Sequence, residues 1–284
     1  MSVTNSALGI KADVKRAGRN AAYSPLMETL ARVGYGVRGL LYIMMGFLAL
    51  QVTLGKGSSP TDMKGAIAAI GKQPGGMVFL WVILIGLVSY SLWGVVRAVF
   101  DPLQKGHDAK GLLARGGFLF SAASYALLIP GAYSLVSGSG SGSSSAASQQ
   151  SLSKIMASPM GHWAIGLIGL AVIAGGVHQI IEGFNNSFDK QFQTYAMSAK
   201  EVKIATQLGR FGTATRGFIF ALIGVLMCLA VYQSNPSQAI GIDTVLKTIL
   251  SQPFGIWLLG IVAVGLIAFG VYSMLSAAWF RLKR

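Results

Sequence analysis

Residues 31–46 read ARVGYGVRGLLYIMMG, and residues 209–224 read GRFGTATRGFIFALIG. Five of the sixteen positions are identical at an offset of 178 residues, and they are two arginines and three glycines placed before or within an apolar run. The same pattern, two arginines at the start of an apolar segment, thus occurs twice. Such recurrence predicts that the chain is built from repeated units.

The composition indicates that lipid surrounds most of the chain. Of 284 residues, 53% are hydrophobic and 11% are charged, whereas soluble domains carry about 25% charged residues. The single cysteine, Cys228, provides neither a disulfide framework nor a thiolate metal site. The net charge of +14 is typical of basic cytoplasmic loops in a membrane protein. We therefore expect the lipid bilayer and anionic lipid headgroups as partners, and no nucleic acid.

Six stretches lack Asp, Glu, Lys and Arg and supply apolar segments for membrane spans. The first is long enough only if its helix begins nearer Ala31 and Arg38 extends toward the headgroups. The third ends in a Gly/Ser-rich linker. Short amphipathic helices, or else ordered loops, are expected at 61–72 and 238–251 on the outer surface. The six stretches are 39–55, 73–96, 116–153, 155–181, 217–242 and 248–280.

Basic residues alternate from loop to loop. Eighteen of the 23 Lys and Arg residues fall in the segment through Arg38, in the loops 97–115 and 190–216, and at the C-terminus. The other five lie in the intervening loops and include Lys154. The positive-inside rule therefore predicts six crossings with both termini in the cytoplasm.

The repeated unit occurs three times, so the sequence predicts an all-α polytopic membrane protein of six transmembrane helices, arranged as three helical hairpins with pseudo-threefold symmetry. A weaker middle copy begins at Arg115, with Ser121 in place of Arg38 and Glu182 in place of Arg97. The first copy carries Arg32, Gly34, Arg38, Gly39, Tyr42, Gly46, Gln73, Pro74, Gly76, Gly86, Tyr90 and Trp93, and the third carries Arg210, Gly212, Arg216, Gly217, Phe220, Gly224, Gln252, Pro253, Gly255, Gly265, Phe269 and Tyr272.

The repeats divide the chain into five parts. Pro74, Pro159 and Pro253 are expected in first helical turns, with Ser158 the best of the preceding caps. The parts are a basic cytoplasmic N-terminal segment 1–28, hairpin repeat 1 at 29–104, a degenerate hairpin repeat 2 at 105–190 with the Gly/Ser-rich outer loop 137–151, a cytoplasmic linker 191–206 and hairpin repeat 3 at 207–284.

These motifs resemble those of bacterial membrane proteins grouped as domain-of-unknown-function family 1206. The family pattern looks like R-x-G-x-x-x-R-G-x-x-Y, a loop, Q-P-F-G, an apolar run and Y-x-x-W, and the first copy fits it from Arg32 to Trp93. The resemblance covers nearly all residues beyond about 28. It implies repeated two-helix units in the bacterial cytoplasmic (inner) membrane, and it implies no activity.

The arginines are the first candidate site. Arg38 and Arg216 lie about 9 Å deeper than Arg32 and Arg210 in a helix. The favoured interpretation is that they extend to cytoplasmic headgroups. The other is a ring of positive charge that binds anionic lipid or guards a pore against cations. Arg38 and Arg216 are thus ligand-binding candidates, whereas Arg32, Arg115 and Arg210 are lipid-headgroup candidates.

His178 and Glu182 are the second candidate, because they lie one turn apart on one helix face. Glu182 is expected to pair with Arg97 or Arg115, or to form a proton-accepting pair with His178 in an intramembrane cavity. Arg97 and Ser121 complete the ligand-binding candidates. Arg97 occupies the repeat position of Glu182, and Ser121 occupies that of Arg38. The recurring aromatic residues are expected to pack between helices.

No metal site, cofactor or enzymatic activity is expected. The three histidines are too dispersed for a shared haem, no Cys/His cluster has zinc spacing, and nucleophile-elbow, P-loop and H-E-x-x-H motifs are absent from the sequence. The sequence favours binding or translocation of a small solute, ion or lipid at a cytoplasm-facing site between the hairpins. The alternative is an accessory or scaffolding subunit that packs against other membrane subunits or a second copy.

Overall fold

The computed structural model describes residues 23–57, 59–138, 154, 158–185, 198–234 and 241–280, and these parts contain helices and no strands. Most of the predicted segment 1–28 and of loop 137–151 lies outside them, as do residues 191–197 of the predicted linker 191–206. The helices are α2 (Pro25–Thr53), α3 (Met63–Gly71), α4 (Gly76–Phe100), α5 (Ala109–Ala126), α6 (Ile129–Val136), α8 (Pro159–Phe184), α9 (Ala199–Tyr232), α10 (Ile242–Leu250) and α11 (Gly255–Trp279).

Six described segments are long and apolar enough to cross a membrane, which confirms the prediction of a polytopic all-α protein. They are α2, α4, α5 with α6, α8, α9 and α11. The third is interrupted by a turn at Leu127 and Leu128, and Pro130 stands in the first turn of α6. Proline is tolerated there because the N–H that it lacks would have no partner within the helix.

Side-chain caps define five of the described helix starts. Ser24, Asp62, Asp108 and Ser158 each accept a hydrogen bond from a backbone N–H of the first turn. Ser198 and Glu201 form a capping box, so α9 begins at Ala199, inside the predicted linker 191–206. Ser158 therefore acts as predicted.

The proline prediction is right for α8 and wrong for α4 and α11. Pro159 lies in the first turn of α8. Pro74 instead occupies the second position of a β-turn in which the Gly76 N–H donates to the Gln73 carbonyl at 2.8 Å. Gly75, the third residue, has φ of 75°, as a type II turn requires.

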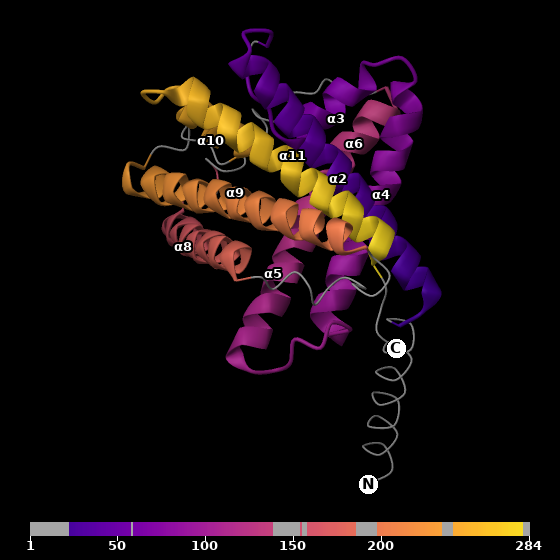
Figure 1. The fold of residues 1–284 in the computed structure, drawn as a ribbon. Helices are drawn as coiled ribbons and strands as arrows, with labels where there is room; N and C mark the ends of the chain where they lie inside the picture. The colour runs from indigo at the N-terminus through magenta and orange to yellow at the C-terminus, as the bar shows by residue number, and fades with distance from the viewer. Residues whose placement is uncertain are drawn as a thin grey trace.

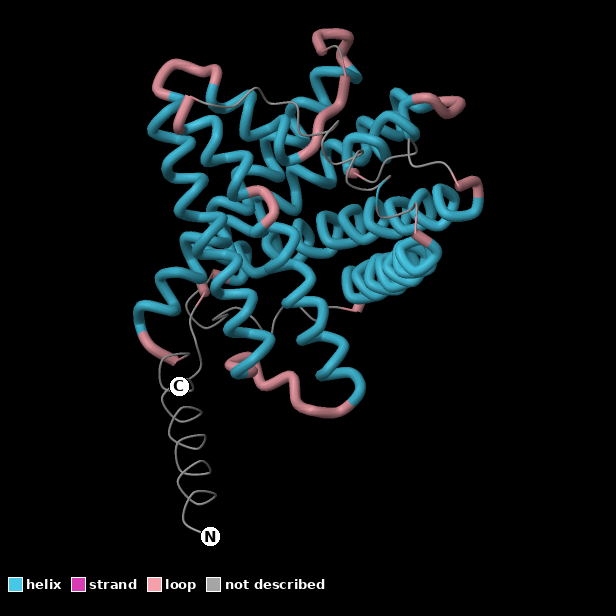
Figure 2. Tube along the Cα trace, turned by 180° about the vertical axis from the view of Figure 1, so that it is seen from behind, coloured by secondary structure: helices cyan, strands magenta, loops and turns pink. Residues whose placement is uncertain are grey.

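The helices follow one another in space in the order α5, α4, α2, α11, α9 and α8, with extensive contacts between successive members (Figures 1 and 2). Five of the six neighbouring pairs of a closed ring are thus present in the described residues. The sixth pair, α5 and α8, makes no extensive contact. The middle copy is divided, with α5 on α4 of the first copy and α8 on α9 of the third. The pseudo-threefold arrangement stays a prediction.

Glycines allow close approach at the two largest seams. A Cβ atom on Gly39 of α2 or on Gly270 of α11 would lie 2.7 Å from the carbonyl oxygen of the other residue. Gly217 of α9 and Gly176 of α8 stand in the same relation at 2.6 Å. Small residues permit such backbone contact in lipid, where helices gain little from hydrophobic burial.

Two short helices cover the end of the bundle where α2 and α9 finish. α3 and α10 lie within the predicted amphipathic ranges 61–72 and 238–251. Each turns apolar side chains inward, such as Ile67 of α3 and Leu246 of α10. We call the other end, where α2 and α9 begin and α4 and α11 finish, the basic end.

Candidate functional site

Arg38 of α2 is buried between three helices. Its Nε donates a hydrogen bond to Ser273 Oγ at 3.1 Å, and its Nη1 donates to the Tyr90 hydroxyl at 3.0 Å. The guanidinium carbon lies 4.8 Å from the Tyr35 ring centroid and 5.0 Å from the Phe269 ring centroid. Only 8% of Arg38 is exposed. The interpretation that Arg38 extends to headgroups is therefore wrong, because rings and hydroxyls of the bundle hold its charge.

Arg216 has the equivalent position in α9 and is half-buried. Its Nε donates to the Tyr42 hydroxyl of α2 at 2.9 Å, and its Nη1 donates to Gln179 Oε1 of α8 at 2.8 Å. Its guanidinium carbon lies 4.5 Å from the Phe220 ring centroid and 5.2 Å from that of Phe269. One side chain of the third copy thus bonds both other copies.

Arg97 is buried near the end of α4, with 5% of its surface exposed. Its Nη1 donates to the Tyr35 hydroxyl at 3.2 Å, and its guanidinium carbon lies 4.5 Å from the Phe118 ring centroid. Its Nε and Nη2 have no hydrogen-bond partner in the described structure. An unpaired buried donor costs about 1–3 kcal/mol, and more when the group is charged.

Shared rings join the three arginines. The Phe269 ring packs against both Arg38 and Arg216. The Tyr90 ring packs against both Arg38 and Arg97, as does the Tyr35 ring. We define the arginine–aromatic cluster as Arg38, Arg97, Arg216, Tyr35, Tyr90 and Phe269.

The cluster holds no ion pair within the described ranges. The two ion pairs formed there join Arg32 to Glu28 and Lys247 to Asp243, outside the cluster. The middle copy adds a neutral group, since Ser121 Oγ lies 3.3 Å from the Tyr90 hydroxyl. Three cations are thus held by aromatic rings, hydroxyls and one amide, which offset only part of the cost of burying charge.

His178 and Glu182 do not join the arginines as expected. His178 is exposed on α8, and Glu182 is half-buried. Glu182 forms no ion pair with a described cation, so the expected pairing with Arg97 or Arg115 is wrong. The described residues bring no three His, Cys, Asp or Glu side chains together in a metal-binding group. A functional role for His178 and Glu182 stays a prediction.

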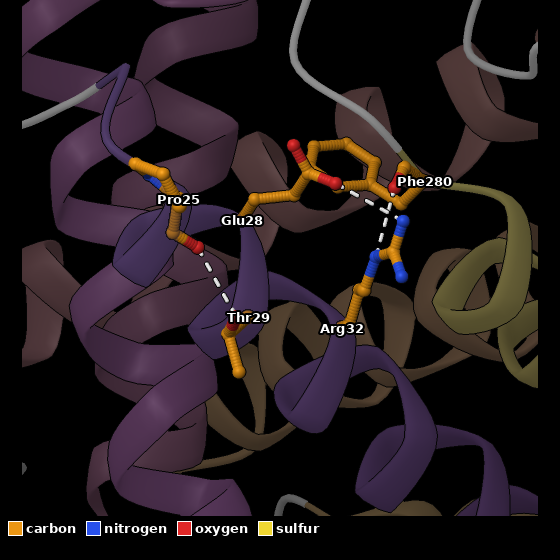
Figure 3. Close-up of polar contacts among 5 residues, drawn as sticks. All are labelled: Pro25, Glu28, Thr29, Arg32 and Phe280. Carbon is orange, nitrogen blue, oxygen red and sulfur yellow. Dashed lines mark hydrogen bonds and ion pairs between the residues drawn. The ribbon is translucent and has the colours of Figure 1, made fainter.

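The first arginines of two copies bond the ends of neighbouring helices. In Figure 3, Arg32 lies between Glu28 and the end of α11, where Nε donates to the Phe280 carbonyl and Nη2 to Glu28 Oε1, both at 3.0 Å. Arg115 donates in the same way to the Ala98 carbonyl of α4 at 2.7 Å. Cationic side chains at helix C-termini donate hydrogen bonds to the unpaired carbonyls there and interact favourably with the negative end of the helix dipole. Arg210 is exposed, and headgroup binding by all three stays a prediction.

Four residues of this site were not expected from the sequence. Tyr35 was missed because the third copy carries Thr213 at its position, although Tyr35 lies one turn before Arg38 on the same face. Ser273, Gln179 and Phe118 carry no motif. These three residues contact the arginines only because particular helices become neighbours, and the repeat pattern alone does not predict which helices do.

Comparisons with known proteins agree with the three copies. The family model described as Domain of Unknown Function (DUF1206) matches residues 33–101, 116–186 and 211–280. The chain is 32% identical over 255 residues to a Bacillus subtilis (strain 168) protein described as uncharacterized protein YxxB, over 90% of this chain and 92% of that protein. No solved structure shows significant similarity.

Proposed function

The chain belongs to the DUF1206 family, and on that premise we propose that it is a non-enzymatic membrane protein that binds an anionic solute, ion or lipid headgroup at a cytoplasm-facing site between its hairpins. The observation that carries this proposal is that two buried arginines, Arg38 and Arg97, and the half-buried Arg216 form no ion pair in the described residues. A buried charge in a membrane protein is expensive and usually serves a function.

The position of the cluster supports binding from one side. Arg97 lies in the last turn of α4, at the basic end, and Arg38 and Arg216 lie deeper. If the positive-inside rule holds, the basic end faces the cytoplasm. The opposite end is covered by the apolar sides of α3 and α10. This arrangement favours a one-sided binding site over a continuous water-filled pore.

Thermal unfolding of the purified protein in detergent tests the proposal. Sodium phosphate, acetate and chloride, and micelles doped with phosphatidylglycerol, are compared at constant ionic strength. A ligand at 100 times its Kd stabilises the folded state by about 2.7 kcal/mol, or about 5 °C for a chain of this size. We expect at least one anion or the anionic lipid to give such a shift. The absence of a shift with all four would overturn the proposal.

A second candidate, an accessory or scaffolding subunit, is favoured by the exposed middle copy. In the most apolar window of α8, 17% of the residues are buried, against 56% in α2 and in α11. His178, an imidazole in a membrane-spanning helix, is exposed on this surface. Chemical cross-linking in intact membranes distinguishes the two, because a scaffold predicts a stoichiometric protein partner along α8.

A further inference from the structure

The unpaired edge of Arg97 has a shape that suits one class of anion. Guanidinium Nε and Nη2 point their N–H groups in parallel from the same edge, and this fork matches two oxygens of a carboxylate or phosphate. These two atoms are the ones without a partner in the described structure, whereas Nη1 is bonded to the Tyr35 hydroxyl. The bond to Tyr35 therefore fixes the guanidinium and leaves its bidentate edge free.

The described residues around Arg97 offer that edge no other hydrogen-bond acceptor. The rings of Phe118, Trp93 and Tyr90 have their centroids within 5.6 Å of the guanidinium carbon. Aromatic faces attract the charge but accept no strong hydrogen bond. The nearby carbonyl oxygens of Ala98 and Val99 already accept hydrogen bonds from Arg115.

From this geometry we infer that Arg97 is the receptor for an oxyanion group, a phosphate or a carboxylate, bound through both oxygens to Nε and Nη2. The inference rests on the proposed function and names its ligand class. Burial strengthens such charge-assisted hydrogen bonds because the local dielectric constant is low. Arg97 lies three residues before the end of α4, so the oxyanion arrives from the basic end. A lipid phosphate and a free oxyanion both have this chemistry.

Binding measurements on the protein in nanodiscs test the inference. One arm uses phosphatidylcholine nanodiscs titrated with phosphate, acetate or chloride, and the other compares phosphatidylglycerol with phosphatidylcholine nanodiscs by thermal unfolding. The variants are Arg97→Lys, which keeps the charge but loses the fork, and Arg97→Gln. Lys203→Gln is the control, because it removes an exposed charge of α9. Gel filtration verifies that each variant is folded.

We expect phosphate or acetate, or the phosphatidylglycerol bilayer, to bind the wild type while chloride binds at least about 10-fold more weakly. Arg97→Lys weakens oxyanion binding by about 10-fold or more, the factor given by one lost charge-assisted hydrogen bond. Lys203→Gln leaves it unchanged. A response in the first arm assigns a free oxyanion, and a response confined to the second assigns a lipid headgroup.

Two results would overturn the inference and leave the proposed function standing. One is equal binding of chloride and phosphate by the wild type, which needs no variant. The other is oxyanion binding that Arg97→Lys does not change. Binding of neither anions nor anionic lipid by the wild type would overturn the inference and the proposed function together.

Discussion

In the first copy, α2 approaches α4 so closely that a Cβ atom at Gly34 would lie 2.8 Å from the Cα atom of Tyr90. In the third copy, Gly212 of α9 meets the backbone of Phe269 in α11 in the same way. At the equivalent place of the middle copy, a Cβ atom on Gly117 of α5 would meet no atom of another described element within 4 Å. The same residue type is thus a packing requirement in two copies and unconstrained in the third.

The difference teaches that the repeat encodes pairs of contacts rather than isolated residues. Where both members of a pair are kept, as Gly34 with Tyr90, the helices close against each other. The middle copy keeps Gly117, but its second helix, α8, packs on α9 instead. The outer copies therefore build the cluster. The middle copy contributes Phe118 and Ser121 from α5 and Gln179 from α8.

Substitution of the paired glycines should give the largest effect. We expect Gly34→Ala and Gly212→Ala each to lower the free energy of unfolding by about 3 kcal/mol, because a methyl group would collide with a neighbouring backbone. Gly117→Ala is the matched control, and it should be neutral or stabilise α5 by up to about 1 kcal/mol. The unfolding midpoint in detergent measures all three. If Gly117→Ala lowered the free energy of unfolding as much as Gly34→Ala, the proposed difference between the middle and outer copies would be wrong.

Removal of single hydroxyls should give an intermediate effect and separate the two outer copies. Tyr90→Phe deprives buried Arg38 of an acceptor and should cost about 2 kcal/mol. Tyr42→Phe deprives half-buried Arg216 of one and should cost about 1 kcal/mol, since water or headgroups can compensate in part. The exposed Tyr133 provides the control, because Tyr133→Phe should change nothing. Reversal of the order of Tyr90 and Tyr42 would contradict the burial that distinguishes their arginines.

The turn before α11 should give the smallest effect. Phe254 has φ of 61° at the position where the first copy has Gly75, and the left-handed region disfavours side chains. Phe254→Gly should therefore raise the free energy of unfolding by about 1 kcal/mol. Gly75→Ala should lower it by a similar amount. Urea unfolding in mild detergent can resolve the two, and a loss of stability in Phe254→Gly would mean that the exposed ring contributes more than the strain costs.

The sequence predicts the helices better than the site. Apolar runs and the recurrence of Arg32, Gly34 and Arg38 are local patterns, so six spans and three copies follow from them. The surroundings of Arg38 depend on Ser273, which is 235 positions away, and no local pattern reports that contact. The expectation that Arg38 extends to headgroups failed for this reason, and the expected partner of Glu182 failed because α8 turns Gln179 to the cluster instead.

The bond between Arg38 and Ser273 also bears on biosynthesis. Ribosomes deliver α2 to the membrane first and α11 last, so Arg38 is inserted long before its partner on α11 exists. Until translation is complete, the nascent chain must shelter that guanidinium with Tyr35 and Tyr90 or with the insertion machinery. Truncated chains that end before α11 should accordingly be preferred substrates for membrane quality-control proteases.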